Sequence, residues 1–182
     1  LEKEFKLNLR QTFLFSTLAW LMVAIFGSLP FLLSANEFTI SEAFFESMSG
    51  ITTTGATIIS DLDNSPKSIL LWRAIMQWLG GIGIVVMAIT ILPLLKVGGM
   101  QLFTAEAPGP SSDKLHPRIT DTAKRLWLIY VSFTLAETVL LFFAGMSLFD
   151  ALNHAMSTLS TGGFSTKNNS LAHWNHLPWI QY

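Results

Sequence analysis

Cysteine is absent from this 182-residue chain, and charged residues are scarce. Without cysteine the chain can form neither disulfide bonds nor thiolate metal sites. Charged residues make up 13% of the sequence and the net charge is −1, which excludes the basic surface that nucleic-acid binding requires. In ordinary soluble domains about a quarter of the residues are charged. The composition therefore points away from a soluble domain and gives no case for nucleic acid as a partner.

Apolar residues fill most of the remaining sequence, and they gather in three long runs. The chain is 51% hydrophobic, and the runs are Phe13–Leu33, Ile69–Leu95 and Leu126–Met146. The first has no charge over its whole length, which at 1.5 Å per residue corresponds to about 30 Å, the thickness of a bilayer core. We expect each run to form a membrane-spanning helix. Arg73, near the start of the second run, either reaches the membrane interface or braces a neighbouring loop.

A repeat relates two shorter stretches. Residues 49–57 (SGITTTGAT) are similar to residues 157–165 (STLSTGGFS), which lie 108 positions later. The same shift aligns Met48 with Met156 and Gly55 with Gly163 without a gap. Repeats of this kind indicate that one structural unit is used twice.

Each repeated stretch follows a short helix with a capping signal. Thr39 with Glu42 fits a capping box, and Ser147 with Asp150 repeats the pattern in the same frame. A helix over 40–48 is about 13 Å long and too short to cross a bilayer. We expect two half-helices that enter the membrane, the second ending near Thr158. The polar loops beyond them are tolerated at membrane depth only where protein or a water-filled cavity surrounds them.

The loops suit a dehydrated monovalent cation. The C-terminus of each half-helix carries the negative end of the helix dipole, and a Thr/Ser/Gly loop can turn carbonyl and hydroxyl oxygens toward one axis. Neither loop contains a carboxylate, which a divalent cation would be expected to demand. For one loop alone, a simple turn between helices is the better interpretation. Two copies in one frame favour a pore lined by both.

Lysine and arginine placement predicts the orientation. The stretch 96–125 carries five such residues and the N-terminal flank three, whereas each loop segment carries one outside the helices. The positive-inside rule places the linker in the cytoplasm and opens both loops outward. Trp174 and Trp179 suit an aromatic belt at the membrane edge, and Glu137 is expected to hydrogen-bond a neighbouring helix. Acidic residues gather on the outer side, where they would concentrate cations: Glu37, Glu42, Glu46, Asp61, Asp63 and Asp150.

Residues 47–57 (SMSGITTTGAT) and 157–166 (STLSTGGFST) resemble the first and second filters of the bacterial Trk-type potassium uptake subunit, the TrkH branch of the Trk/Ktr/HKT superfamily. Residues 98–103 (GGMQLF) and 106–110 (EAPGP) resemble the cytoplasmic linker of that branch. The resemblance implies an all-α membrane protein with potassium-channel-like units of helix, pore half-helix, filter loop and helix, four of which surround one pore.

The same resemblance implies the ion site and the partners. Carbonyl groups of the filter loops would bind K⁺, with Gly55 and Gly163 as the key glycines and Gly162 as a competing candidate for the second position. It also implies a multi-pass protein of the bacterial inner membrane that contacts lipid, forms a homodimer and binds a cytosolic nucleotide-binding gating subunit of the TrkA type. A serine in place of the first glycine goes with sodium preference in this family, so Gly55 favours potassium. The filter residues expected in this sequence are Thr53, Thr54, Gly55, Thr161, Gly162 and Gly163.

The chain divides into a first repeat (1–96), a cytoplasmic linker (97–123) and a second repeat (124–182) that stops before its closing helix. We therefore expect a fragment of a four-repeat pore that does not conduct alone. No catalytic residue and no cofactor besides the transported K⁺ is expected.

Two alternatives remain beside potassium uptake. Transport of sodium or of monovalent cations without selectivity is compatible with the same loops. An intramembrane hydrolase would use Ser157 or Ser160 with His154, which lies three residues before Ser157. A scaffold that transports nothing would leave the paired, capped half-helices unexplained.

Overall fold

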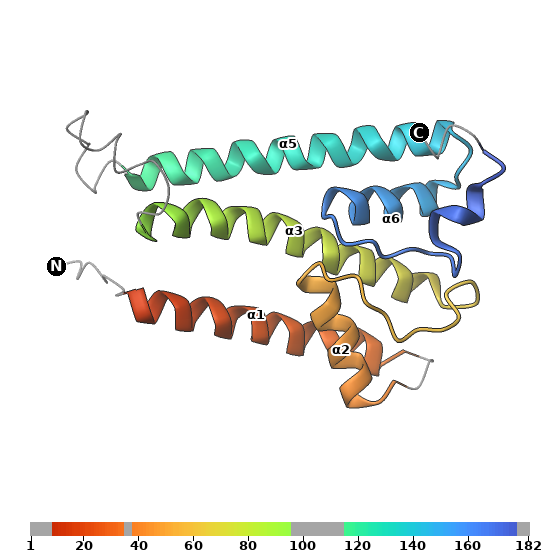
Figure 1. The fold of residues 1–182 in the computed structure, drawn as a ribbon, viewed down its shortest axis with the longest axis horizontal. Helices are drawn as coiled ribbons and strands as arrows, with labels where there is room; N and C mark the ends of the chain where they lie inside the picture. Colours follow the sequence, from red (N-terminus) through yellow and green to blue (C-terminus); the bar gives the residue numbers. More distant parts are fainter. Residues whose placement is uncertain (1–8, 35–37, 96–114, 178–182) are drawn as a thin grey trace.

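The computed structural model describes residues 9–34, 38–95 and 115–177, and within this part every regular element is helical. The elements are α1 (Leu9–Leu32), α2 (Ile40–Ile51), α3 (Lys67–Leu95), α5 (Leu115–Phe143), α6 (Leu148–Leu159) and the 3₁₀ helix η2 (Ser170–Trp174) (Figure 1). The expected all-α membrane architecture is confirmed.

Three helices are long and apolar enough to cross a membrane, namely α1, α3 and α5. Their spans are Arg10–Leu32, Lys67–Met87 and Asp121–Phe143. Half of the α3 span is buried, against 11% of the α5 span, so α3 is the central helix. Large apolar side chains on the outer faces are exposed, among them Phe15 and Leu140. Such faces suit contact with lipid or with further apolar protein.

The sequence placed the third span too late. Helix α5 begins at Leu115, within the stretch expected to be linker, and ends at Phe143 rather than Met146. Pro117 falls in the first turn, where the backbone N–H groups have no partner within the helix and proline is tolerated. Gly145 ends α5 with φ +112°, while the N–H of Met146 donates to the carbonyl of Leu141. Residues 97–114 of the expected linker lie outside the described residues.

Both half-helices begin at the predicted caps. The Thr39 hydroxyl accepts a hydrogen bond from the Glu42 N–H, and the Glu42 carboxylate accepts one from the Thr39 N–H at 2.8 Å. In α6 the Ser147 hydroxyl accepts from the Asp150 N–H at 3.1 Å. Helix α2 runs to Ile51 and α6 to Leu159, so both fall well short of a membrane span.

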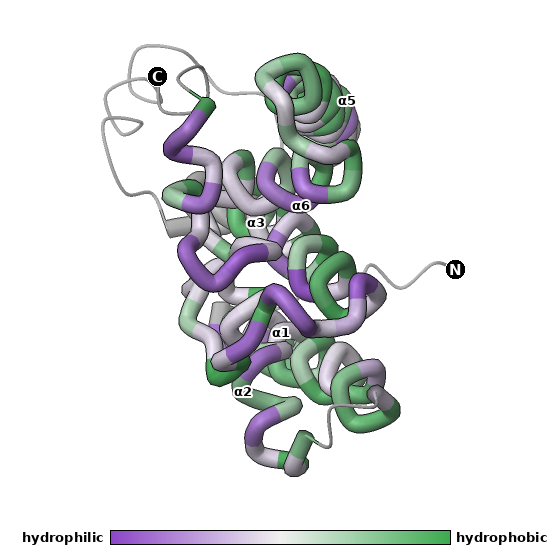
Figure 2. The backbone as a smooth tube through the Cα atoms, turned by 90° about the vertical axis from the view of Figure 1, so that its right-hand side faces the viewer, coloured by the Kyte–Doolittle hydropathy of each residue, from purple (hydrophilic) through white to green (hydrophobic). Residues whose placement is uncertain are grey.

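The long helices run side by side, and both half-helices lie in the same half of the molecule, on either side of α3 (Figure 1). The first residues of α1, the last of α3 and the first of α5 are at the opposite end. Figure 2 views the molecule from the end that holds the half-helices. It shows hydrophilic segments between the helices near the middle, flanked by the hydrophobic turns of α1 and α5. This arrangement is that of two re-entrant units joined along α3.

Glycines of α3 let the loop ends approach the helix backbone. A Cβ on Gly80 would overlap the carbonyl oxygen of Ile51, and a Cβ on Gly81 would lie 2.8 Å from the Cα of Ser160. Gly83 faces the Trp20 ring. The prediction that these glycines serve packing is confirmed.

Trp174 does not belong to an aromatic belt. It is 5% exposed and packs with Met146 and Ala151, and its ring lies edge-on to His154 with the centroids 5.0 Å apart. Trp179 lies outside the described residues.

Candidate functional site

The candidate site consists of the two loops that follow the half-helices, the first loop (residues 52–57) and the second loop (residues 160–165). Each begins with the same set of hydrogen bonds. The N–H of Thr53 donates to the carbonyl of Gly50, and the N–H of Thr54 to that of Ser49. In the second loop Thr161 donates to Thr158 and Gly162 donates to Ser157. This is the Schellman pattern that ends many helices, and it occurs in the same frame in both repeats.

The residue that turns each helix end is a threonine in a left-handed conformation. Thr53 has φ 57° and Thr161 has φ 58°. Helices usually place glycine here, and the conformation costs a β-branched residue about 1–2 kcal/mol. Two residues later Gly55 has φ 77° and Gly163 has φ 81°. Gly163, and not Gly162, is therefore the conformational equivalent of Gly55.

The two loops touch through their backbones. A Cβ on Gly55 would overlap the carbonyl oxygen of Gly162, and a Cβ on Gly162 would overlap the side-chain amide of Gln77 from α3. The structure therefore brings expected filter residues of both repeats together where Gly55 meets Gly162, a contact that we call the seam between the repeats. Within the described part of the chain, Thr54, Thr161 and Gly163 are exposed, Thr53 and Gly55 are half-buried, and Gly162 is buried.

A buried ion pair between α2 and α3 contacts both loops. Arg73 Nε donates to Glu46 Oε1 at 2.8 Å, and the two side chains are 1% and 0% exposed. The same carboxylate accepts hydrogen bonds from the hydroxyl of Thr57, the last residue of the first loop, and from the N–H of Ile58, which follows it.

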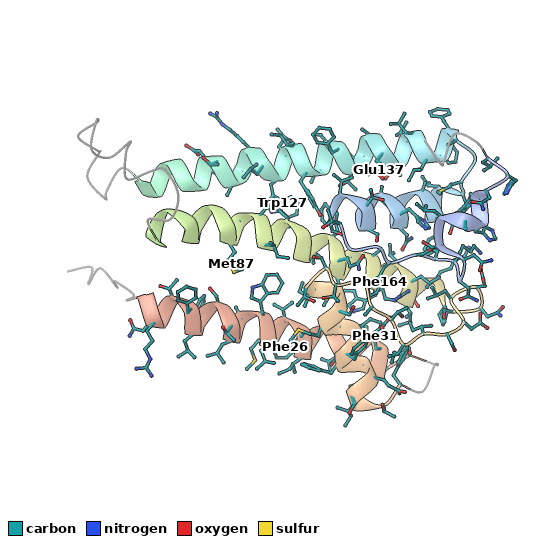
Figure 3. All side chains as sticks on the ribbon, viewed as in Figure 1. Phe26, Phe31, Met87, Trp127, Glu137 and Phe164 are labelled. Atoms are coloured by element: carbon teal, nitrogen blue, oxygen red, sulfur yellow. The ribbon has the colours of Figure 1, made fainter. Side chains whose placement is uncertain are left out.

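Arg73 also reaches the second loop. Its Nη1 donates to the carbonyl of Ser165 at 3.4 Å, and its guanidinium carbon lies 4.0 Å from the centre of the Phe164 ring (Figure 3 shows Phe164 between the two half-helices). Of the two alternatives for Arg73, the structure selects the brace, because this side chain is buried against both repeats and does not extend to the membrane interface.

The second repeat replaces the carboxylate with an imidazole. His154, in the position of Glu46, contacts the Ser165 hydroxyl through Nε2 at 3.0 Å and the Asp150 carbonyl through Nδ1 at 2.8 Å. Ser165 takes the place of Thr57, so the helix-to-loop contact is kept with different chemistry.

These contacts contradict the hydrolase alternative. The Ser157 hydroxyl donates to Gln77 Oε1, and the Ser160 hydroxyl donates to the Ser157 carbonyl. His154 is bonded to Ser165 instead. A nucleophilic serine requires a base within hydrogen-bond reach, and neither candidate serine is bonded to the imidazole.

Further contacts tie the half-helices and loops to their surroundings. Glu137 of α5 is half-buried, and Figure 3 places it on the side of α5 that faces α6. The expected hydrogen bond from Glu137 to a neighbouring helix stays a prediction. After the loops, the N–H of Leu62 donates to Asn168 Oδ1 at 2.7 Å, and Lys167 pairs with Asp63 at 3.2 Å. The segments that leave the two loops are therefore joined as well.

A polar hollow of about 440 Å³ opens beside the segment that follows the first loop, and Glu42 and Asp61 line it. Hydrogen bonds from the backbone and hydroxyl of Thr39 lower the pKa of Glu42, and hydrogen bonds from the side chain and backbone of Asn64 lower the pKa of Asp61. Both carboxylates are thus negative at neutral pH. Glu37, another expected acidic residue, lies outside the described residues.

Glu46, Gln77 and Ser165 are site residues that the sequence did not reveal as such. Glu46 was expected only to add negative charge at the outer mouth, and it is instead completely buried. A polar residue in an apolar run is a signal that could have drawn attention to Gln77.

Comparisons with known proteins identify the family. The sequence model of the TrkH family, described as a cation transport protein, matches residues 1–182. The Trk system potassium uptake protein TrkH of Escherichia coli (strain K12) is 51% identical over 172 residues, which are 93% of this chain and 36% of that protein. TrkG of the same organism is 40% identical over 173 residues, covering 94% of this chain and 36% of that protein.

A solved structure agrees. The crystal structure of the potassium transporter TrkH from Vibrio parahaemolyticus matches with a TM-score of 0.81 at 44% identity, covering 94% of this chain and 34% of that one. The present chain spans about a third of the length of the relatives it matches. Membership rests on the match along the whole chain and on the shared helical fold. The chain therefore belongs to the TrkH family of cation transport proteins, which are membrane transporters and not enzymes.

Proposed function

We propose that this chain contributes two of the filter segments of a potassium uptake pathway. Backbone carbonyls of the two loops would replace the water shell of K⁺ as it passes. The observation that supports this most directly is the contact between two loops of matching conformation, in which Gly55 lies against the carbonyl oxygen of Gly162. The residues proposed to line the path are Thr53, Thr54, Gly55, Thr161, Gly162 and Gly163.

The electrostatics of the site fit a monovalent cation. Each loop follows the C-terminus of a half-helix, where the dipole is negative, and Glu42 and Asp61 line a hollow nearby. Neither loop carries a carboxylate of its own, and divalent cations are usually held by carboxylates. The arrangement therefore favours weak binding and rapid passage.

The rest of the assembly is proposed from the family resemblance and, for the substrate, from the names of the relatives. Their names describe potassium uptake proteins of the Trk system, and we propose the same substrate here, with four repeats around the pore. The proposal includes the division into repeats at 1–96 and 124–182 with a linker at 97–123, whose last residues, from Leu115 on, are the first turns of α5. It also includes loops that open outward, a homodimer, a TrkA-type nucleotide-binding partner and the bacterial inner membrane.

The test uses the full-length native chain in liposomes. Cation flux is measured under a potassium gradient and then a sodium gradient, with the nucleotide-binding partner present. Wild type is compared with Gly55→Ser and Gly163→Ser, because a side chain at either position disturbs a left-handed glycine of a loop. Gly83→Ser is the matched control, since Gly83 lies in α3 and faces the Trp20 ring rather than a loop.

Potassium-preferring flux that both loop substitutions weaken, and that Gly83→Ser leaves intact, is the expected result. Equal potassium and sodium flux in wild type would support the non-selective alternative, and sodium preference would support sodium transport. No flux in wild type would mean that the loops are only connectors between helices.

A further inference from the structure

Gln77 is a fully buried amide in the central helix, at the seam between the two repeats. Its side chain is 0% exposed, and it lies one helical turn after Arg73 on the same face of α3. Burying an amide is unfavourable unless hydrogen bonds compensate it, so its partners indicate what it contributes.

One oxygen of this amide binds both the end of α6 and a residue of the second loop. Gln77 Oε1 accepts hydrogen bonds from the Ser157 hydroxyl at 2.8 Å and from the Phe164 N–H at 3.2 Å. Ser157 precedes the loop and Phe164 directly follows Gly163. The Phe164 N–H can only donate, so it fixes which end of the amide faces it.

The other end of the amide lies between the loops. A Cβ on Gly55 would be 3.6 Å from Gln77 Nε2, and a Cβ on Gly162 would overlap the amide itself. Among the described residues Nε2 is buried and has no hydrogen-bond partner. Gln77 thus binds the second loop through its oxygen and turns its nitrogen toward the place where both loops meet.

Selectivity in a carbonyl-lined filter depends on the number and placement of the oxygens. A shift of the second loop relative to Gly55 would move the Gly162 carbonyl that Gly55 contacts. We propose that Gln77 is a positioning residue that holds the two filter loops at a fixed separation and thereby sets the preference for potassium over sodium. This proposal rests on the proposed function, because it assigns selectivity to those loops.

The test compares variants of the full-length chain in liposomes. Gln77→Met keeps a similar side-chain volume but removes both acceptor sites. Gln77→Glu keeps an acceptor oxygen for Ser157 and Phe164. Trp72→Phe is the control, because it removes a hydrogen bond from α3 to the Gly27 carbonyl of α1 and none to either loop.

Two quantities are measured, namely the ratio of potassium to sodium flux and the hydrogen–deuterium exchange of the peptide that contains Phe164. With Gln77→Met we expect the flux ratio to fall by about tenfold and exchange at Phe164 to accelerate. Gln77→Glu restores the exchange protection and brings the ratio closer to that of wild type. Trp72→Phe changes neither quantity by more than about twofold.

An unchanged ratio in a folded Gln77→Met protein overturns the proposal, as does an equal fall in Trp72→Phe, which would indicate general loosening of α3. If wild type carries no cation flux, the proposed function fails. Unchanged hydrogen–deuterium exchange at Phe164 in Gln77→Met would then independently overturn the inference that Gln77 holds the second loop in place. Should Gln77→Met fail to fold, Ser157→Ala removes one of the two hydrogen bonds and is expected to lower the ratio by about threefold. An unchanged ratio in Ser157→Ala also counts against the proposal.

Discussion

The Glu46–Arg73 pair offers the sharpest test of how the loops are supported. Its nitrogen and oxygen atoms are 2.8 Å apart and both side chains are buried. At an effective dielectric constant of about 20, two unit charges at that distance attract by about 6 kcal/mol. Desolvation of the two ions opposes this gain by several kcal/mol each. The pair as a whole therefore contributes little, whereas breaking it leaves one buried charge without compensation.

Glu46→Gln and Arg73→Met are each expected to lower the free energy of unfolding by about 3–5 kcal/mol. The double variant leaves neither charge and is expected to lose only about 1–3 kcal/mol, much less than the sum of the single losses. The assay is unfolding of the full-length chain in mixed micelles by added dodecyl sulfate, followed by tryptophan fluorescence. Lys167→Met is the control, because its bridge to Asp63 is partly exposed and is worth less than about 1 kcal/mol.

Single losses below about 1 kcal/mol, or a double variant whose loss equals the sum, would refute the reasoning. Either result would mean that water or another group satisfies Arg73 when Glu46 is neutral.

Three other predictions use the same unfolding assay. Gly80→Ala is expected to lower the free energy of unfolding by about 1–3 kcal/mol, because the new methyl group overlaps the Ile51 carbonyl. In the control Gly83→Ala the methyl group would lie 3.4 Å from the Trp20 ring, and stability is expected to stay level or rise by up to about 1 kcal/mol. Equal effects of the two substitutions would contradict the packing argument. Thr39→Ala is expected to cost about 1 kcal/mol and to raise the lowered pKa of Glu42 toward its ordinary value. Because the folded pKa of Glu42 is below the unfolded one, the cap contributes fully above the unfolded pKa and is lost as pH falls through the folded one, which a carbon-13 titration of Glu42 checks. The backbone N–H of residue 39, the larger cause of the lowered pKa, remains in Thr39→Ala, so the pKa is expected to rise only part of the way. An unchanged pKa would mean that the Thr39 hydroxyl does not stabilise the Glu42 carboxylate. Thr161→Gly relieves about 1–2 kcal/mol of left-handed strain, and the added chain entropy of the unfolded state costs about 0.5–1 kcal/mol. Stability is therefore expected to stay level or rise by up to about 1.5 kcal/mol. A loss of stability would mean that the Thr161 side chain makes contacts of its own.

Local features of the sequence determined the elements. The run Phe13–Leu33 gave a span because a bilayer core requires a fixed length of apolar helix, and α1 is found at Leu9–Leu32. Thr39 and Ser147 marked the starts of α2 and α6, because a capping hydroxyl bonds to the N–H three residues ahead and needs no distant partner. The internal repeat correctly paired Gly55 with Gly163, whose φ angles agree.

Errors arose where distant packing overrides local signals. The start of α5 was placed too late because Pro117 and the charged residues after it read as linker, although the first turn of a helix tolerates proline. Trp174 was assigned to the membrane edge by its residue type, but it is buried against Ala151 and His154. The spacing of His154 and Ser157 suggested a pair, yet each bonds elsewhere.

The sequence by itself thus determined the spans, the two capped half-helices and the glycine frame, because these depend on composition and on contacts within a few residues. Only the tertiary structure decided that Arg73 braces the loops rather than reaching the membrane interface, and that Gln77 joins the end of α6 to the residue after Gly163. Most buried polar groups find hydrogen-bond partners, and the fold decides which residues those partners are. The partners of Gln77 are 80 and 87 residues away along the chain, a separation that no local pattern encodes.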